Sequence, residues 1–203
     1  MCGVIGLIQQ LDRDDLGLTA AELLKTLEYR GYDSTGAAVQ GEGTAVTLVK
    51  GVGAPSVMVH QLGITSLGGS IFCGQVRWAT FGAVDDDNSQ PHQVRCKTHL
   101  YGAHNGNVTN CDDLKAWLTG EGHEVRSDND GEMVVHTVEH HFALELARLD
   151  EGQRADASAR RGCMRAALVA AAARLEGSYA AVVVDPVSRC VWAVKQGSSL
   201  YFG

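Results

Sequence analysis

The first six residues, Met1-Cys2-Gly3-Val4-Ile5-Gly6, are the most informative stretch of this sequence. Cys2 and Gly3 lead into an alternating apolar run, which predicts a buried strand with a tight start over residues 2–9. If Met1 is removed, Cys2 carries a thiol and a free α-amine on the same Cα, with reference pKa values near ~8.5 and ~8. A thiolate is the reactive form, so the stretch indicates a nucleophile beside its own base. The alternative is that position 2 holds an arbitrary small residue.

The composition is that of one globular domain without a nucleic-acid partner. The chain has 203 residues, of which 45% are hydrophobic and 20% are charged, and such values are typical of a single folded domain. The formal charge of −7 argues against binding to a phosphate backbone, because proteins that do so carry basic clusters. The tight basic cluster Arg160-Arg161 with Arg165 falls on a predicted helix, and we expect it to be a solvated face.

The cysteines and the hydropathy together predict a cytoplasmic protein with no membrane partner. The six cysteines, at positions 2, 73, 96, 111, 163 and 190, show neither paired CxxC spacing nor a secretory leader before them. This usage is typical of reduced thiols in a cytosolic protein. The longest apolar run, residues 166–173, is shorter than the ~18 residues that a membrane span requires.

The hydrophobic pattern predicts strands at both ends of the chain and helices in the middle. Thr19 and Glu22 have the spacing of a capping box at the start of a helix over residues 19–28, and Asn110 is the expected cap of a helix over residues 111–119. This order favours an α+β architecture in which helices cover antiparallel sheets. The remaining expected elements are strands at 37–39, 45–49, 71–78, 99–104, 179–184 and 190–194, and helices at 131–147 and 155–175.

The segment Gly74-Gln75-Val76-Arg77-Trp78-Ala79-Thr80-Phe81-Gly82 ends a predicted strand with an arginine, followed three residues later by a threonine. A guanidinium at such a rim can hold a carboxylate with two parallel hydrogen bonds, and the Thr80 hydroxyl can add a third. The segment therefore predicts a carboxylate site at Arg77 and Thr80. The alternative is a surface arginine beside a core tryptophan.

The segment His104-Asn105-Gly106-Asn107 follows the apolar strand over residues 100–103. A side-chain amide next to a glycine N–H can supply two donors where negative charge develops, so Asn105 and Gly106 are candidates for an oxyanion hole. The competing interpretation is a simple turn, which is the more common role of Asn-Gly.

The segment Ser127-Asp128-Asn129-Asp130-Gly131-Glu132 precedes a predicted helix. Acidic residues in this place suit helix capping and the positive end of the helix dipole. The alternative is that one of the carboxylates holds a substrate ammonium.

The segment His136-Thr137-Val138-Glu139-His140 matches H-x-x-E-H, a pattern of zinc hydrolases on a helix. Its two histidines would share one helix face, but no third ligand helix follows, and His141 reads as a further polar-face residue. The sequence also contains no GxGxxG or GxxxxGK[ST] motif for nucleotide phosphates. We therefore expect no metal and no cofactor.

Together these motifs resemble the glutaminase domain of the class II glutamine amidotransferases, which are N-terminal-nucleophile hydrolases. Within that family, the stretch over residues 29–33 is most similar to the aminosugar synthases (glutamine:fructose-6-phosphate amidotransferases), since other branches typically have RGQDS or RGPD there. The matching motifs follow the order of the family over nearly the whole chain: Cys-Gly at 2–3, LEYRGYDSTG at 27–36, RWAT at 77–80, PH at 91–92, HNG at 104–106, SDND at 127–130 and LEGSYA at 175–180.

The resemblance implies one domain over residues 2–203, built as a four-layer αββα sandwich of two antiparallel sheets between helical layers. It implies hydrolysis of L-glutamine to L-glutamate and ammonia through a γ-glutamyl thioester. The ammonia would serve an attached or separate synthase that makes glucosamine 6-phosphate, and a homodimer is a possible assembly. The residues that the resemblance assigns to the site are Cys2 as nucleophile, Asn105 and Gly106 at the oxyanion, Arg77 and Thr80 at the α-carboxylate, Asp130 at the α-ammonium, and Trp78 as a further substrate contact.

The chain departs from the family pattern in two respects. The family usually has His-Thr before the arginine and a histidine after the threonine, where this chain has Gln75-Val76 and Phe81. Because Phe81 cannot donate a hydrogen bond, we expect one contact near the substrate carboxylate to be missing or replaced. The sugar isomerase half is absent, and we expect a C-terminally incomplete fragment. The alternatives are a stand-alone glutaminase subunit, as in split glutamate synthases, and a non-catalytic domain that binds glutamine.

Overall fold

The computed structural model describes residues 2–80 and 82–203 and contains two four-stranded antiparallel sheets. The first sheet has the strand order β1-β4-β2-β3, and the second has the order β5-β6-β7-β8. The strands of the first sheet are β1 (Gly3–Arg13), β2 (Ser34–Gln40), β3 (Val46–Val52) and β4 (Gly69–Arg77). Those of the second are β5 (His92–Val94), β6 (Leu100–Val108), β7 (Gly177–Asp185) and β8 (Cys190–Gln196).

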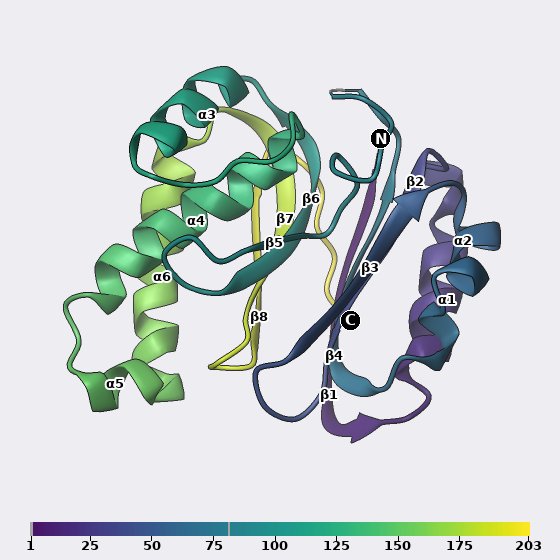
Figure 1. The fold of residues 1–203 in the computed structure, drawn as a ribbon, viewed down its shortest axis with the longest axis horizontal. Coiled ribbons are helices and arrows are strands. Elements are labelled where there is room, and N and C mark those ends of the chain that lie inside the picture. The colour runs from purple at the N-terminus through teal and green to yellow at the C-terminus, as the bar shows by residue number, and fades with distance from the viewer. Residues whose placement is uncertain (1, 81) are drawn as a thin grey trace.

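Helices cover the outer face of each sheet, and this gives the predicted αββα sandwich (Figure 1). The first sheet is covered by α1 (Leu16–Thr26) and α2 (Pro55–Gln61), with short 3-10 turns at Glu28–Arg30 and Ile64–Ser66. The second sheet is covered by α3 (Cys111–Gly120), α4 (Asp130–Leu146) and α6 (Ala157–Arg174), and the short α5 (Glu151–Ala155) joins the last two.

Buried apolar side chains fill the space between the sheets. Strand β1 packs closely against the second sheet at Gly6, where an added Cβ would lie 2.8 Å from a methyl of Val182. Burying a Val or Leu side chain contributes about 1.5–3 kcal/mol, so this layer and the two helix–sheet layers supply most of the stability. The layer between the sheets consists of Ala38, Ile71, Cys73, Tyr101, Ala103, Val182 and Val184.

Most predicted elements are confirmed within a few residues, but the predicted side-chain caps are not. Asn110 lies in the cap position of α3, yet its side chain makes no cap hydrogen bond and binds the backbone of Arg174 and Glu176 instead. Helix α1 begins at Leu16, with Asp15 in the cap position and no side-chain cap bond. Thr19 therefore lies inside the helix rather than at its start. The carboxylate of Asp15 accepts two hydrogen bonds of 2.7 Å from Arg13 instead. The structure also adds elements that the pattern did not predict: α2, β5, the short α5 and the two 3-10 turns.

The prediction of a solvated arginine face on α6 is wrong for Arg160. Its guanidinium is buried and donates two hydrogen bonds of 2.8 Å to the carboxylate of Asp185, at the end of β7. The first turn of α6 packs over this end of the sheet, and a buried arginine there needs a paired carboxylate. Arg161 and Arg165 are exposed, as expected.

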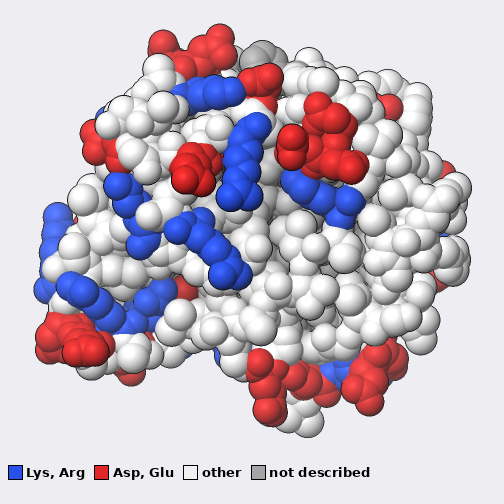
Figure 2. Space-filling model, viewed as in Figure 1, with Lys and Arg blue, Asp and Glu red and all other residues white. Residues whose placement is uncertain are grey.

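Charged side chains of both signs are interspersed on the face shown in Figure 2, mostly over the helical side of the second sheet. On this face of the described residues the basic side chains do not merge into one continuous field. Among the helices that the structure describes, none has the length and apolar character needed to span a bilayer.

Candidate active site

Cys2 lies in a pocket of about 740 Å³ that opens between the ends of the two sheets. The antiparallel pairing of Gly3 with Val76 brings Cys2 beside Trp78, the first residue after β4. The backbone N–H of Trp78 donates to the Cys2 Sγ at 3.4 Å, and the thiol lies 3.5 Å from the Trp78 carbonyl oxygen. The pocket is lined by Cys2, Trp78, Thr80, Asn105, Gly106, Asn107, Val108, Thr109, Cys111, Asp112, Ser178 and Ser198.

The surroundings of Cys2 favour the neutral thiol over the thiolate. Burial raises the pKa of the Cys2 thiol, and the hydrogen bond from Trp78 and the charge of Arg77 only partly oppose this effect. A nucleophile in this state needs a base to remove its proton. The backbone nitrogen of Cys2, which would be the α-amine once Met1 is removed, lies on the same residue and donates to Asn105 Oδ1 at 3.1 Å.

Asn105 and Gly106 lie within strand β6, so the interpretation of Asn-Gly as a simple turn is wrong. In the ladder with β7, Asn105 pairs with Ala180 and Gly106 with Tyr179. Gly106 has φ +148°, and a Cβ at this position would overlap the Ser178 carbonyl oxygen. Only glycine fits here, and its absence of a side chain leaves the backbone exposed to the pocket. Since the Asn105 Oδ1 accepts from Cys2, its amide N–H₂ is available as a donor.

The alternative of a surface arginine beside a core tryptophan is wrong, because Arg77 is buried and Trp78 is exposed. Arg77 is 1% exposed, whereas Trp78 is 44% exposed. The Arg77 guanidinium donates to the carbonyl oxygens of Ala83 at 2.7 Å and Gly82 at 3.3 Å. It therefore orders the loop after β4. Thr80 lines the Cys2 pocket, but Arg77 is not among the lining residues.

Asp130 is the first residue of α4 and is buried behind the pocket wall. Its Oδ2 accepts the Val108 N–H at 3.0 Å and lies 3.2 Å from His104 Nε2. Burial works against ionisation, but the contact with His104 and the Val108 hydrogen bond lower the pKa of Asp130. The helix cap is provided by the neighbouring Asn129, whose side chain accepts the Gly131 N–H at 2.9 Å. Asp130 is thus a charged group near the site rather than the cap.

Sequence reasoning missed several residues that shape this pocket. Asp33 accepts the Ala79 N–H at 2.8 Å and so holds the loop that carries Thr80. The ring of Tyr32 packs against Trp78 with centroids 5.4 Å apart. Both belong to the turn-rich segment over residues 29–36, which was the available signal. Ser178, within the LEGSYA motif at 175–180, and Ser198, which had no sequence signal, also line the pocket. The expectation concerning Phe81 lies outside the described residues, as does Met1.

Comparisons with known proteins identify the family to which this chain belongs. Residues 77–202 match the model of a family described as "Glutamine amidotransferase domain". A glutamine–fructose-6-phosphate aminotransferase (isomerizing) of Pyrococcus horikoshii is 38% identical over 184 residues, which is 91% of this chain and 27% of that protein. The protein of the same name from Clostridium tetani is 32% identical over 204 residues, covering 100% of this chain and 30% of that protein. The chain thus spans about three tenths of the length of these curated relatives.

Solved structures share the fold. The glutamine phosphoribosylpyrophosphate amidotransferase of B. subtilis superposes with a TM-score of 0.67 at 23% identity, over 92% of this chain and 35% of that one. A glutamine aminotransferase class-II domain protein from Silicibacter pomeroyi superposes with a TM-score of 0.51 at 15% identity, over 82% of this chain and 70% of that one. These likenesses show the two-sheet fold, and the family match covers more than half of the sequence. The chain belongs to the glutamine amidotransferase domain family.

Proposed function

We propose that residues 2–203 form a glutaminase domain that hydrolyses L-glutamine through a thioester on Cys2. The observation that carries the proposal is the hydrogen bond of 3.1 Å from the backbone N–H of Cys2 to Asn105 Oδ1, which brings the nucleophile residue and a side-chain amide together across 103 positions of sequence. Both face a pocket that also contains the backbone of Gly106. A nucleophile with converging donors is the arrangement that acyl transfer requires.

The chemistry begins when Met1 removal exposes the α-amine of Cys2. This amine takes the thiol proton, and Sγ attacks the side-chain carbonyl carbon of glutamine. The Asn105 amide and the Gly106 N–H stabilise the resulting oxyanion. The amine returns the proton to the leaving nitrogen, the C–N bond breaks, and ammonia leaves a γ-glutamyl thioester. Water then attacks the thioester, which releases glutamate and restores the thiol.

Substrate recognition requires one positive and one negative group, because free glutamine is a zwitterion. Arg77 and Asp130 supply these charges near Cys2, since both act on the pKa of its thiol, Arg77 lowering it and Asp130 raising it. In this proposal the Thr80 hydroxyl and the Trp78 ring, which line the pocket, contact the substrate directly. In the same proposal Arg77 holds the α-carboxylate and Asp130 holds the α-ammonium, which requires both groups to become accessible when glutamine binds, since neither lines the pocket.

The names of the relatives support a proposal for the activity of the whole protein. The named relatives are glutamine–fructose-6-phosphate aminotransferases that are more than three times as long as the matched region. We infer that the ammonia serves an amino-sugar synthase, present as a further domain or as a partner subunit, and that the assembly is a homodimer. All cysteines of the described chain are unpaired, which supports a reducing, cytoplasmic location.

The test is to measure glutamate formation together with the intact mass after incubation with 6-diazo-5-oxo-L-norleucine, a reactive glutamine analogue. We expect a chain without Met1 that forms glutamate and carries one adduct, which maps to Cys2. The Cys2→Ala variant should form neither glutamate nor adduct. Turnover that persists in this variant, or a processed and folded chain with no adduct, would overturn the proposal.

A further inference from the structure

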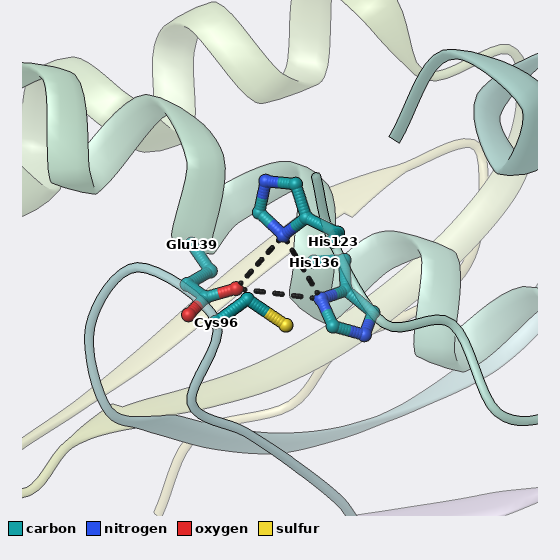
Figure 3. Close-up of side chains that lie close together, drawn as sticks. All are labelled: Cys96, His123, His136 and Glu139. Atoms are coloured by element: carbon teal, nitrogen blue, oxygen red, sulfur yellow. Dashed lines mark hydrogen bonds and ion pairs between the residues drawn. The ribbon is translucent and has the colours of Figure 1, made fainter. Parts of the chain in front are cut away.

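Four metal-ligating side chains meet near the middle of α4, apart from the Cys2 pocket (Figure 3). His136 and Glu139 lie on α4, one turn apart. His123 comes from the segment that joins α3 to α4, and Cys96 comes from the segment that follows β5. Their donor atoms all lie within 4.8 Å of one another. We name this group, Cys96 with His123, His136 and Glu139, the Cys96 cluster.

The distances within the Cys96 cluster fit the edges of a tetrahedral metal site. The two Nδ1 atoms of His123 and His136 are 3.3 Å apart, and they lie 3.0 Å and 3.3 Å from the same oxygen, Glu139 Oε2. A tetrahedral zinc ion with bonds of about 2.0–2.3 Å separates its ligand atoms by about 3.2–3.6 Å. The three inner donors therefore already surround a point at bonding distance. Cys96 Sγ points toward the same group (Figure 3).

The inner donors of the cluster are buried. His123 is 4% exposed, His136 1% and Glu139 0%. The Nδ1 atoms of both histidines and Glu139 Oε2 face one another in this buried space (Figure 3). A buried carboxylate is stabilised by a paired charge, and a dication at the centre of the cluster would supply that charge.

A second set of contacts orients each ligand as in known metal sites, where outer partners fix the ligand atoms. The other oxygen of Glu139, Oε1, accepts the backbone N–H groups of Lys97 at 2.7 Å and Thr98 at 3.0 Å. Cys96 Sγ accepts the Glu124 N–H at 3.2 Å, which fixes the orientation of this side chain. These bonds leave Glu139 Oε2 and a sulfur lone pair directed at the centre of the cluster.

We propose that the Cys96 cluster is a structural Zn²⁺ site with Cys96 Sγ, His123 Nδ1, His136 Nδ1 and Glu139 Oε2 as its four ligands. A thiolate and two imidazoles select zinc over the oxygen-seeking ions Mg²⁺ and Ca²⁺. One thiolate and one carboxylate balance the charge of the dication, so the buried site is neutral. Four protein ligands make it closed, as structural zinc sites are. A pocket of about 240 Å³, lined by Cys96, Glu132 and His136, gives the ion a path of entry.

This site departs from the expectation of no metal, and it differs from the H-x-x-E-H pattern. The second histidine of that pattern, His140, is an outer residue whose Nδ1 lies 3.2 Å from His123 Nε2. Two of the four ligands precede the helix and come from loops rather than from a later helix. The bound ion would fasten both loops to α4, including the segment over residues 121–129 that leads into Asp130.

The proposal is tested on the purified full chain by metal content and by Co²⁺ substitution, neither of which depends on glutamine turnover. After dialysis against metal-free buffer and reloading with Zn²⁺, we expect one zinc ion per chain. The Co²⁺ form should show the strong visible bands of a tetrahedral site and a thiolate-to-cobalt charge-transfer band. Cys96→Ala should abolish the charge-transfer band, because the thiolate supplies it.

The matched control is Cys190→Ala, which removes another partly exposed cysteine from the start of β8 and should keep the band. If Cys96→Ala fails to fold, as judged by circular dichroism, the His140→Gln variant replaces it, since the proposal requires that variant to retain the tetrahedral spectrum. The proposal is overturned if the folded wild-type chain binds no Co²⁺, or if its spectrum is the same in Cys96→Ala. It is also overturned if His140→Gln loses the spectrum while remaining folded.

Discussion

The Cys2 pocket and the Cys96 cluster use the same kind of side chain in opposite settings. Cys2 faces a pocket of about 740 Å³, and its thiol forms hydrogen bonds with the backbone of Trp78. Cys96 faces three other donor atoms, all within 4.8 Å. Helix α4 connects the two regions, because Asp130 at its start lies behind the pocket while His136 and Glu139 lie further along the helix.

The difference shows that the surroundings of a cysteine in the fold decide which chemistry its thiol can perform. A thiol that borders an open volume, with donors on one side only, leaves room for a substrate carbon, as binding sites do. A thiol whose neighbours are two imidazoles and a carboxylate belongs instead to a set of donors that can converge on an ion. Variants that affect one region and spare the other can test this division.

The largest effect is expected from Cys2→Ser. Loss of the nucleophile should lower the rate of glutamate formation by on the order of 10⁶-fold, as it does in other hydrolases. Steady-state glutamate release measures this, and thermal unfolding should show an unchanged Tm, since the thiol packs against no core cluster. Substantial turnover by Cys2→Ser would break the comparison, because it would mean that the open pocket is not the reacting site.

A smaller loss is expected from Asn105→Asp. The aspartate keeps an acceptor for the backbone N–H of Cys2 but loses the amide donor, so only stabilisation of the oxyanion should suffer. In comparable sites such a loss costs on the order of 10²–10³-fold in kcat. The measurement is kcat against KM for glutamine. A change confined to KM would instead indicate that Asn105 only binds the ground state.

The Cys96 cluster should respond to metal rather than to substrate. In a chelator-treated chain, Zn²⁺ at about a hundred times its Kd should stabilise the fold by about 2.7 kcal/mol, which corresponds to a rise in Tm on the order of 5–10 °C. The Glu139→Gln variant should lose most of this rise, because an amide is a poor zinc ligand. An equal rise in the variant would contradict a ligand role for Glu139.

The smallest expected effect is a dependence of stability on pH at His92, the first residue of β5. Its Nε2 lies 3.2 Å from Asn129 Oδ1, the cap of α4. Burial, with a contribution from Lys50, lowers the pKa of His92 from 6.5 to about 3. The unfolded chain therefore binds a proton more readily than the folded one. The resulting stability is complete above pH 6.5 and is lost as pH falls toward about 3.

The check on this prediction is urea unfolding of the wild type and of His92→Gln at about pH 7 and about pH 4, on either side of the histidine's ordinary pKa. We expect the free energy of unfolding to fall less in the variant than in the wild type between these two conditions. Equal losses would mean that other groups carry the acid sensitivity of the region that joins the pocket to the cluster.

Local sequence signals predicted much of the fold and of the Cys2 pocket. The apolar alternation marks β1, and the helical spacing of apolar residues marks α1, because these patterns need only a burial direction. The oxyanion candidates Asn105 and Gly106 were named from their residue types. The reverse burial of Arg77 and Trp78 was not predictable, since it depends on how the loop after β4 folds back over the guanidinium.

By itself, the sequence determined the order of strands and helices, the nucleophile candidate Cys2 and the family resemblance, because each depends on residue types at short or fixed spacings. Only the tertiary structure decided which distant residues share a site. Cys96 and His123 have no periodic relation to His136 and Glu139, and they meet because two loops pack against one face of α4. Contacts of this kind depend on chain closure over many residues, and no local spacing encodes them.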